Sequence, residues 1–219
     1  MLKKVLAIIL CASLLLCLGA CSKKDSEKKD ETESLVKNEE TQTQEADNSQ
    51  LYQNSIKFTI ELENGGVMKG EVYPNLAPET VKNFTKLVNE HFYDGLIFHR
   101  VIKDMMIQGG GYDKDMNPKE SGTTIKGEFE SNGFKNDLKH TRGVISMART
   151  KVPDSASSQF FIVHQDTPYW DGQYAAFGRI TEGIDIVDEI ATCETGVYQP
   201  YNMSDVPVEP VIIKTITLN

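Results

Sequence analysis

The side chains best suited to act on a substrate lie between residues 100 and 161 of the chain. Arg100 follows a Phe-His pair, Gln108 precedes a run of glycines, and Gln159 stands close to Phe161. A guanidinium carries a permanent charge and several donors in one plane, while an amide can both donate and accept. Taken alone, Arg100 would also suit a surface salt bridge, so its role depends on the surrounding motifs.

Several other chemistries are disfavoured by spacing. The glycine run at residues 109–111 lacks the Lys-Ser/Thr that completes a phosphate-binding loop. Ser146 has no glycine two residues before it, so the nucleophile elbow is missing. No Cys pair accompanies the histidines, and none has metal-ligand spacing: His91, His99, His140 and His164. We therefore expect no metal site.

Three blocks of sequence together resemble the cyclophilins. The first reads Phe-His-Arg-Val-Ile at residues 98–102 and Met-Ile-Gln-Gly-Gly at residues 106–110. The second reads Gly-Val-Ile-Ser-Met-Ala at residues 143–148 and Ser-Gln-Phe-Phe-Ile at residues 158–162. The third, Asp-Gly-Gln-Tyr-Ala-Ala-Phe-Gly, covers residues 171–178. Each block alone is weak evidence, but their order and spacing are specific.

The resemblance covers residues 55–219 and implies both a fold and an activity. The fold is mainly β, a closed eight-stranded antiparallel barrel capped by two α-helices. The activity is peptidyl-prolyl cis-trans isomerisation, without metal, cofactor or covalent intermediate. The substrates would be proline-containing unfolded or extended polypeptides, bound in a groove on the outer face of the barrel.

Matching the family motifs residue by residue also implies a site. Arg100 takes the place of the catalytic arginine, which polarises the twisted amide. Met105, Met106 and Phe161 take the places of the apolar walls around the proline ring. The remaining positions expected to face the peptide or line the groove are His99, Gln108, Ala148, Arg149, Gln159, Tyr169 and Tyr174.

Some of these positions depart from the best-known members of the family. Met105 and Arg149 stand where many relatives have Phe and Asn, and Tyr169 stands where drug-sensitive relatives often have Trp. Trp170 is then shifted to a position where Leu is common. These departures put cyclosporin sensitivity in doubt and leave an alternative open, a binding module that keeps the groove without useful catalysis.

The elements that must position these residues follow from periodicity. Alternating apolar residues predict strands at 56–62, 67–72 and 211–218, and a helix is expected to begin near Pro78. Its first residues, Ala-Pro-Glu-Thr-Val-Lys-Asn-Phe, look like the corresponding cyclophilin segment. A second helix is expected at 182–191. Further short strands are expected at 96–101, 105–109, 129, 143–149, 159–164 and 176–180.

The first 20 residues are predicted to be a bacterial lipoprotein signal peptide. Two lysines precede an apolar run that is short for a membrane span, and the run ends in Leu-Gly-Ala-Cys. Cys21 would then receive a diacylglyceryl group, which anchors the chain at the extracytoplasmic face of the cell membrane. A plain signal peptide or an uncleaved anchor is the alternative.

Residues 21–54 are predicted to form a disordered polar linker after the lipidated cysteine. They contain too few apolar residues to offset the entropy of ordering. With the signal removed and Cys21 lipidated, only Cys193 remains, so no disulfide is expected. The chain has 23 Lys and Arg against 32 Asp and Glu, a net charge of −9, which disfavours a nucleic-acid partner. We expect a monomer.

Overall fold

The computed structural model describes residues 52–199 and 201–219. The predicted signal peptide at 1–20, Cys21 and all but the last three residues of the predicted linker at 21–54 lie outside the described residues. Among the described residues, no helix is both long and apolar enough to cross a membrane. Residues 52–54 form a turn before the first strand, and the ring of Tyr52 packs edge-on against Tyr73, with centroids 4.8 Å apart.

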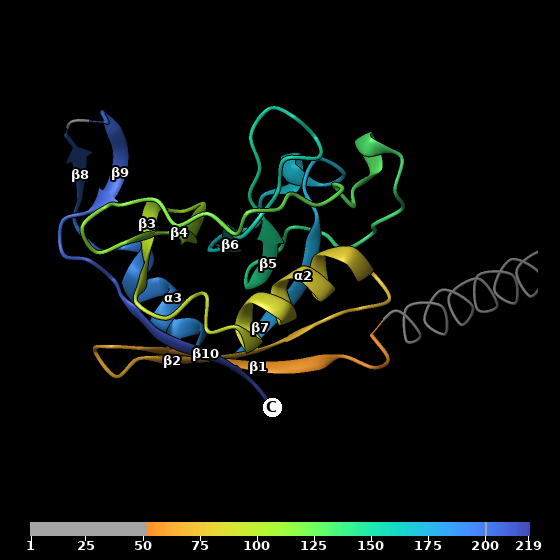
Figure 1. Cartoon of the computed structure of the whole chain (residues 1–219), viewed down its shortest axis with the longest axis horizontal. Helices are drawn as coiled ribbons and strands as arrows, with labels where there is room; N and C mark the ends of the chain where they lie inside the picture. The colour runs from red at the N-terminus through yellow and green to blue at the C-terminus, as the bar shows by residue number, and fades with distance from the viewer. Residues whose placement is uncertain (1–51, 200) are drawn as a thin grey trace, which may run out of the picture. The chain divides into compact units, whose positions relative to one another are not determined.

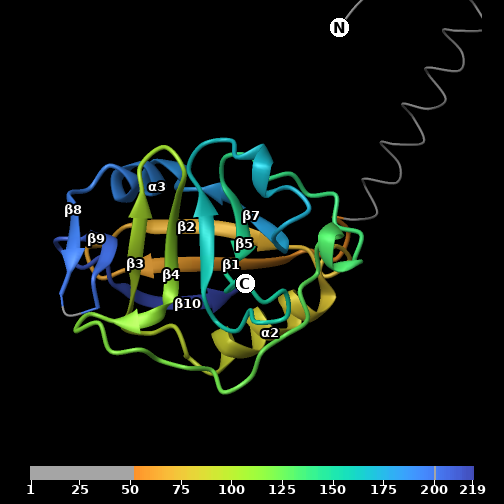
Figure 2. The ribbon, with the colours of Figure 1, turned by 90° about the horizontal axis from the view of Figure 1, so that it is seen from above.

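Eight strands form one antiparallel sheet in the order β10-β1-β2-β7-β5-β6-β4-β3 (Figures 1 and 2). They are β1 (Ile56–Leu62), β2 (Val67–Val72), β3 (Leu96–Ile102), β4 (Met106–Asp113), β5 (Val144–Met147), β6 (Phe160–Val163), β7 (Ala176–Glu182) and β10 (Ile213–Leu218). The two end strands approach each other, because the Phe98 amide donates to the Val211 carbonyl (3.0 Å) and Ile97 pairs with Ile212. The predicted barrel is therefore confirmed, nearly closed.

Helices α2 (Pro78–Asn89) and α3 (Ile184–Ala191) lie on opposite sides of this barrel (Figure 2). The first begins at a proline, as expected, since a missing amide hydrogen costs nothing in the first helical turn. Its first residue has no side-chain cap of its own. Instead the buried carboxylate of Glu128 accepts from the amides of Glu79 (3.0 Å) and Thr80 (2.8 Å). A residue far along the chain thereby accepts hydrogen bonds from amides that have no partner within the helix. Its negative charge also interacts favourably with the positive end of the helix dipole.

The barrel interior is filled by aromatic rings around Phe84 of α2. Its ring centroid lies 5.6 Å from that of Phe58, 5.3 Å from Phe177 and 6.0 Å from Phe160, and all four side chains are fully buried. Two of these contacts are edge-to-face and one is tilted, geometries that aromatic pairs prefer. The helix that the sequence predicted from Pro78 thus contributes a central ring to the barrel interior.

One sequence prediction about secondary structure was wrong, and one pair of strands was not predicted. Phe129 is not in a strand: it is buried just before the 3-10 helix η1 (Glu130–Asn132). The side chain is apolar because it is buried in the core. A single aromatic residue in a sequence looks the same whether it is buried in a loop or in a strand. The pair that was not predicted is a two-stranded hairpin before the last strand, β8 (Thr195–Tyr198) and β9 (Met203–Pro207).

We expect Phe84→Ala to lower the free energy of unfolding by about 3–5 kcal/mol, because it removes the ring that the other core aromatics contact. Lys82→Ala, on the exposed face of the same helix, should change it by less than about 0.5 kcal/mol. Urea unfolding of both variants gives the comparison. Equal stabilities would show that the ring does not organise the core.

Candidate active site

Strand register places three of the predicted site residues side by side on the outer face of the barrel. Arg100 of β3 pairs with Gln108 of β4, and Gln108 pairs with Phe161 of β6. Directly paired residues on neighbouring strands point to the same face of a sheet. The next positions in β4 and β6, Ile107 and Ile162, point the other way into the core. Residues far apart in sequence therefore form one continuous row.

An irregularity in β3 decides which way Arg100 points. Phe98 pairs with Gly109 but Arg100 pairs with Gln108, so β3 has one extra residue, His99, at this point. Phe98 and Val101 both lie in the barrel core, three residues apart. In a regular strand Arg100 would share the face of Phe98 and point inward. The bulge at His99 turns the guanidinium to the outside.

Next to this row lies an open cavity of about 150 Å³. Its apolar floor is the ring of Phe161, which meets Trp170 edge-on (centroids 4.9 Å apart) and Tyr174 edge-on (5.6 Å). Its lining residues are Arg100, Met106, Gln108, Ala148, Arg149, Phe161, Trp170 and Tyr174. The arrangement offers an apolar surface for a small ring with a guanidinium and an amide at its edge.

Arg149 is held flat at the rim of this cavity. Its guanidinium carbon lies 4.6 Å from the ring centroid of Tyr174 and 4.9 Å from that of Phe129. Its nitrogens donate to the carbonyls of Gln173 (2.8 and 3.1 Å) and Thr150 (2.9 Å). Arg149, which stands where many cyclophilins have Asn, thus forms part of the cavity wall and is held there by cation–π contacts.

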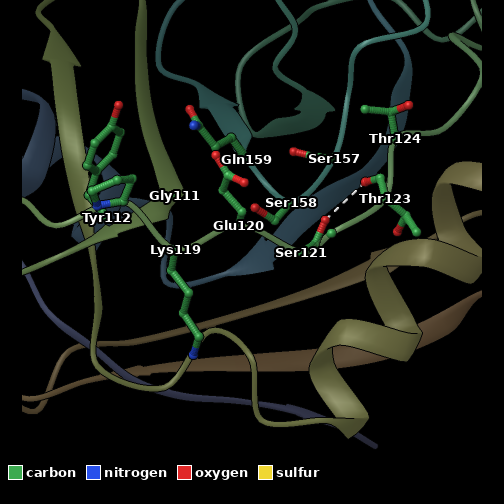
Figure 3. A pocket seen from close by; sticks show the side chains of 12 residues that line it. Gly111, Tyr112, Lys119, Glu120, Ser121, Thr123, Thr124, Ser157, Ser158 and Gln159 are labelled. Carbon is green, nitrogen blue, oxygen red and sulfur yellow. Dashed lines mark hydrogen bonds between the residues drawn. The ribbon is translucent and has the colours of Figure 1, made fainter.

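A pair of amides joins this cavity to a larger one of about 540 Å³. Gln108 Nε2 donates to Gln159 Oε1 (2.8 Å), and because that bond uses the amide nitrogen of Gln108, its amide oxygen can accept from a peptide N–H. Figure 3 shows Glu120, Ser157 and Gln159 around the larger cavity, contributed by the loop after β4 and the segment before β6. A hydrogen bond from Ser121 Oγ to the Thr123 carbonyl (3.1 Å) braces that loop.

A buried polar network supports the Phe161 ring from behind. His140 Nδ1 lies 3.1 Å from Asp171 Oδ1, its Nε2 lies 3.1 Å from Ser146 Oγ, and its ring stacks on Phe161 with centroids 6.0 Å apart. The connectivity is that of a Ser-His-Asp triad. Ser146, however, is fully buried, so no substrate can reach it, and burial lowers the pKa of His140. The neutral His140 ring, which is hydrogen-bonded to both Asp171 and Ser146, therefore supports the Phe161 side of the pocket.

The structure brings together seven of the eleven residues expected around the substrate, namely Arg100, Met106, Gln108, Ala148, Arg149, Phe161 and Tyr174. Gln159 lies at the larger cavity, Met105 packs beside the Met106 cluster, and His99 is buried in the bulge. Tyr169 does not line the cavity, since its side chain points into solvent and is 60% exposed. The neighbouring residue Trp170 lines the cavity instead.

Sequence reasoning placed Trp170 outside the site because its neighbour matched the family position. The one available signal was its type, since it is the only Trp in the chain and stands beside the third conserved-looking block. Among the described residues, no group of three or more His, Cys, Asp or Glu could hold a metal ion.

Comparison with known proteins agrees with this geometry. The family model "Cyclophilin type peptidyl-prolyl cis-trans isomerase/CLD" matches residues 56–218. A peptidyl-prolyl cis-trans isomerase of Acinetobacter baylyi is 44% identical over 160 residues, which span 71% of this chain and 81% of that protein. Peptidyl-prolyl cis-trans isomerase B of Escherichia coli is 41% identical over 167 residues, 71% of this chain and 96% of that protein.

Solved structures show the same likeness. A cyclophilin type isomerase of Cryptosporidium parvum aligns with a TM-score of 0.62 at 28% identity, and the alignment covers 75% of this chain and 98% of that one. The same protein has been solved in the presence of the dipeptide Ala-Pro. The chain therefore belongs to the cyclophilin type peptidyl-prolyl cis-trans isomerases. It is an enzyme of that class.

The burial of His99 predicts a pH-dependent stability. Burial lowers its pKa from 6.5 to about 4, so the unfolded chain takes up this proton at higher pH than the folded one. The unfolded state then binds more protons between those values, and the free energy of unfolding should decrease as pH falls from about 6.5 towards 4. The loss attributable to His99 would reach about 3 kcal/mol at the lower limit.

Urea unfolding at a series of pH values measures this loss. His99→Phe keeps a ring of similar size beside Tyr112 but cannot titrate, so its stability should depend less steeply on pH over the same range. The same pH dependence in both proteins would show that His99 does not cause the loss.

Proposed function

We propose that this isomerase acts on Xaa-Pro bonds in extended segments of exported polypeptides, and that Arg100 assists the twisting of the amide. The observation that carries the proposal is the row of Arg100, Gln108 and Phe161 on three adjacent strands. The proline ring would sit on Phe161, and the peptide backbone would bond to Gln108. The guanidinium then stands at the edge of the same cavity, next to the bond that rotates.

Rotation about an Xaa-Pro amide bond needs few other catalytic groups. Resonance makes rotation about the peptide bond cost about 18–20 kcal/mol, yet the two isomers before proline differ by only about 1 kcal/mol. In the twisted state resonance is lost and the prolyl nitrogen becomes a better hydrogen-bond acceptor. A donor that binds this state more tightly than either planar isomer lowers the barrier without a nucleophile. Arg100 supplies such a donor with a permanent charge.

The proposed location rests on the sequence before the barrel. A lipid on Cys21 and a polar linker up to residue 54 would keep a monomeric barrel tethered at the extracytoplasmic face of the cell membrane. Newly exported chains emerge there unfolded, and uncatalysed proline isomerisation takes tens of seconds, which is slow enough to limit folding. Proline-containing segments of such chains are the proposed substrates.

We expect Arg100→Ala to lower kcat/KM for an Xaa-Pro peptide by about 100-fold or more, because one preorganised donor to the twisted amide is lost. A protease-coupled assay at low temperature or NMR exchange measures the rate. Arg179→Ala is the matched control, since it removes an exposed arginine from β7 of the same barrel. An unchanged rate in the Arg100 variant would refute the proposed mechanism.

The anchor has a separate test. Cys21→Ala should move the protein from the membrane fraction to the soluble fraction once its signal is removed, whereas Cys193→Ala should leave it at the membrane. Membrane fractionation with immunoblotting, together with mass spectrometry of the N-terminus, reads the outcome. A Cys21 variant that remains at the membrane after signal removal would contradict the lipid tether.

A further inference from the structure

The hairpin formed by β8 and β9 is docked firmly beside the strand that carries Arg100. Val206 of β9 is buried with Ile97 of β3 and Met116 in a small apolar cluster separate from the barrel core. Tyr112, Tyr198, Met203 and Ile212 pack around it. Both strands of the hairpin contribute to this one cluster, and its apolar contacts fix the position of the hairpin. The residue before Val206 therefore has little freedom relative to β3.

That residue is Asp205, and its backbone adopts an unusual conformation. Its φ is +64°, in the left-handed region. Residues other than glycine seldom adopt this region, and among them Asp and Asn tolerate it best. Ser204 Oγ donates to Asp205 Oδ2 (3.0 Å). A left-handed residue inside a strand redirects its side chain away from the ordinary alternation. In this conformation the carboxylate lies next to Arg100 of β3.

The carboxylate contacts the guanidinium that the proposed function makes catalytic. Asp205 Oδ2 lies 3.6 Å from Arg100 Nε, and within the described residues no other carboxylate forms an ion pair with Arg100. The two side chains are 36% and 43% exposed, so water weakens the attraction. The contact is made through Nε, the guanidinium nitrogen that is bonded to the alkyl chain of the arginine.

We propose that Asp205 is a positioning residue for Arg100: it holds Nε and so directs the terminal nitrogens at the bound prolyl amide. This inference rests on the proposed function of Arg100. An arginine side chain loses much rotamer freedom when it is fixed in one place. With Asp205 in contact, part of that freedom is already lost before the substrate binds. The guanidinium is then available in the orientation that the twisted amide needs.

The experiment compares the wild-type protein with Asp205→Asn, which keeps the shape and the tolerance for a left-handed φ but removes the charge. Binding and catalysis are separated by NMR titration and exchange with one Xaa-Pro peptide. We expect the catalysed exchange rate of the bound peptide to fall about three- to fivefold, the size of an exposed ion pair, with Kd changed less than twofold. Asp205→Gly, which also accepts this φ, should be affected at least as much.

A second measurement tests the contact between Asp205 and Arg100 directly, through the mobility of the guanidinium. The ¹⁵N relaxation of Arg100 Nε–H should show a more mobile guanidinium in Asp205→Asn than in the wild-type protein. Glu209→Gln is the control, because it removes an exposed acid shortly after the hairpin without touching Arg100. It should alter neither the exchange rate nor the Nε–H mobility.

The outcomes separate the two proposals. A slower exchange rate together with a looser Arg100 in Asp205→Asn supports the positioning role. An unchanged rate in an active protein, or an Arg100 Nε–H as ordered as in the wild type, overturns it. If the wild-type protein showed no catalysis, the proposed function would fail, and the Nε–H mobility alone would still decide whether Asp205 holds Arg100.

Discussion

The pairing register between β3, β4, β6 and β5 is the constraint on which the rest of this site depends. Arg100, Gln108, Phe161 and Ser146 occupy successive paired positions on these four strands. A slip of one residue in any strand would exchange the outer and inner faces and send site residues into the core. The bulge at His99 is part of the same constraint. It allows β3 to point Phe98 and Val101 into the core and Arg100, which lies between them, to the outside.

Packing on both sides of the sheet keeps this register in place. Inside, Ile107, Ile145 and Ile162 join the aromatic core around Phe84. Outside, Phe161 is supported by Trp170, Tyr174 and the stacked ring of His140. Because packed rings leave few alternative rotamers, the apolar surface around Phe161 is formed before any peptide arrives. A preformed surface reduces the entropy lost when a flexible substrate binds.

The charges of the groove are arranged to keep its two arginines in place while its histidines stay neutral. Arg100 has a partially exposed carboxylate beside it, and Arg149 lies between two rings and bonds to backbone carbonyls. Burial lowers the pKa of both His99 and His140. Proton transfer is not required for rotation about an amide, and a site built from fixed cations and neutral polar groups suits that reaction.

The sequence by itself predicted both helices and most of the strands, because short-range periodicity carries that information locally. The Phe-His-Arg, Gln-Gly-Gly and Phe-Phe-Ile motifs implied the closed barrel and most of the groove through their resemblance to the cyclophilins. The sequence also predicted Arg100, Gln108 and Phe161 as one site, which the register then aligned. The tertiary structure alone decided that Trp170 and not Tyr169 faces the cavity, since burial depends on which side of a short 3-10 turn each ring emerges. It alone brought Glu128 to the start of α2 and Asp205 to Arg100. Those contacts join residues 48 and 105 positions apart in the chain, and the local sequence around a carboxylate does not show whether it meets water, the start of a helix or an arginine.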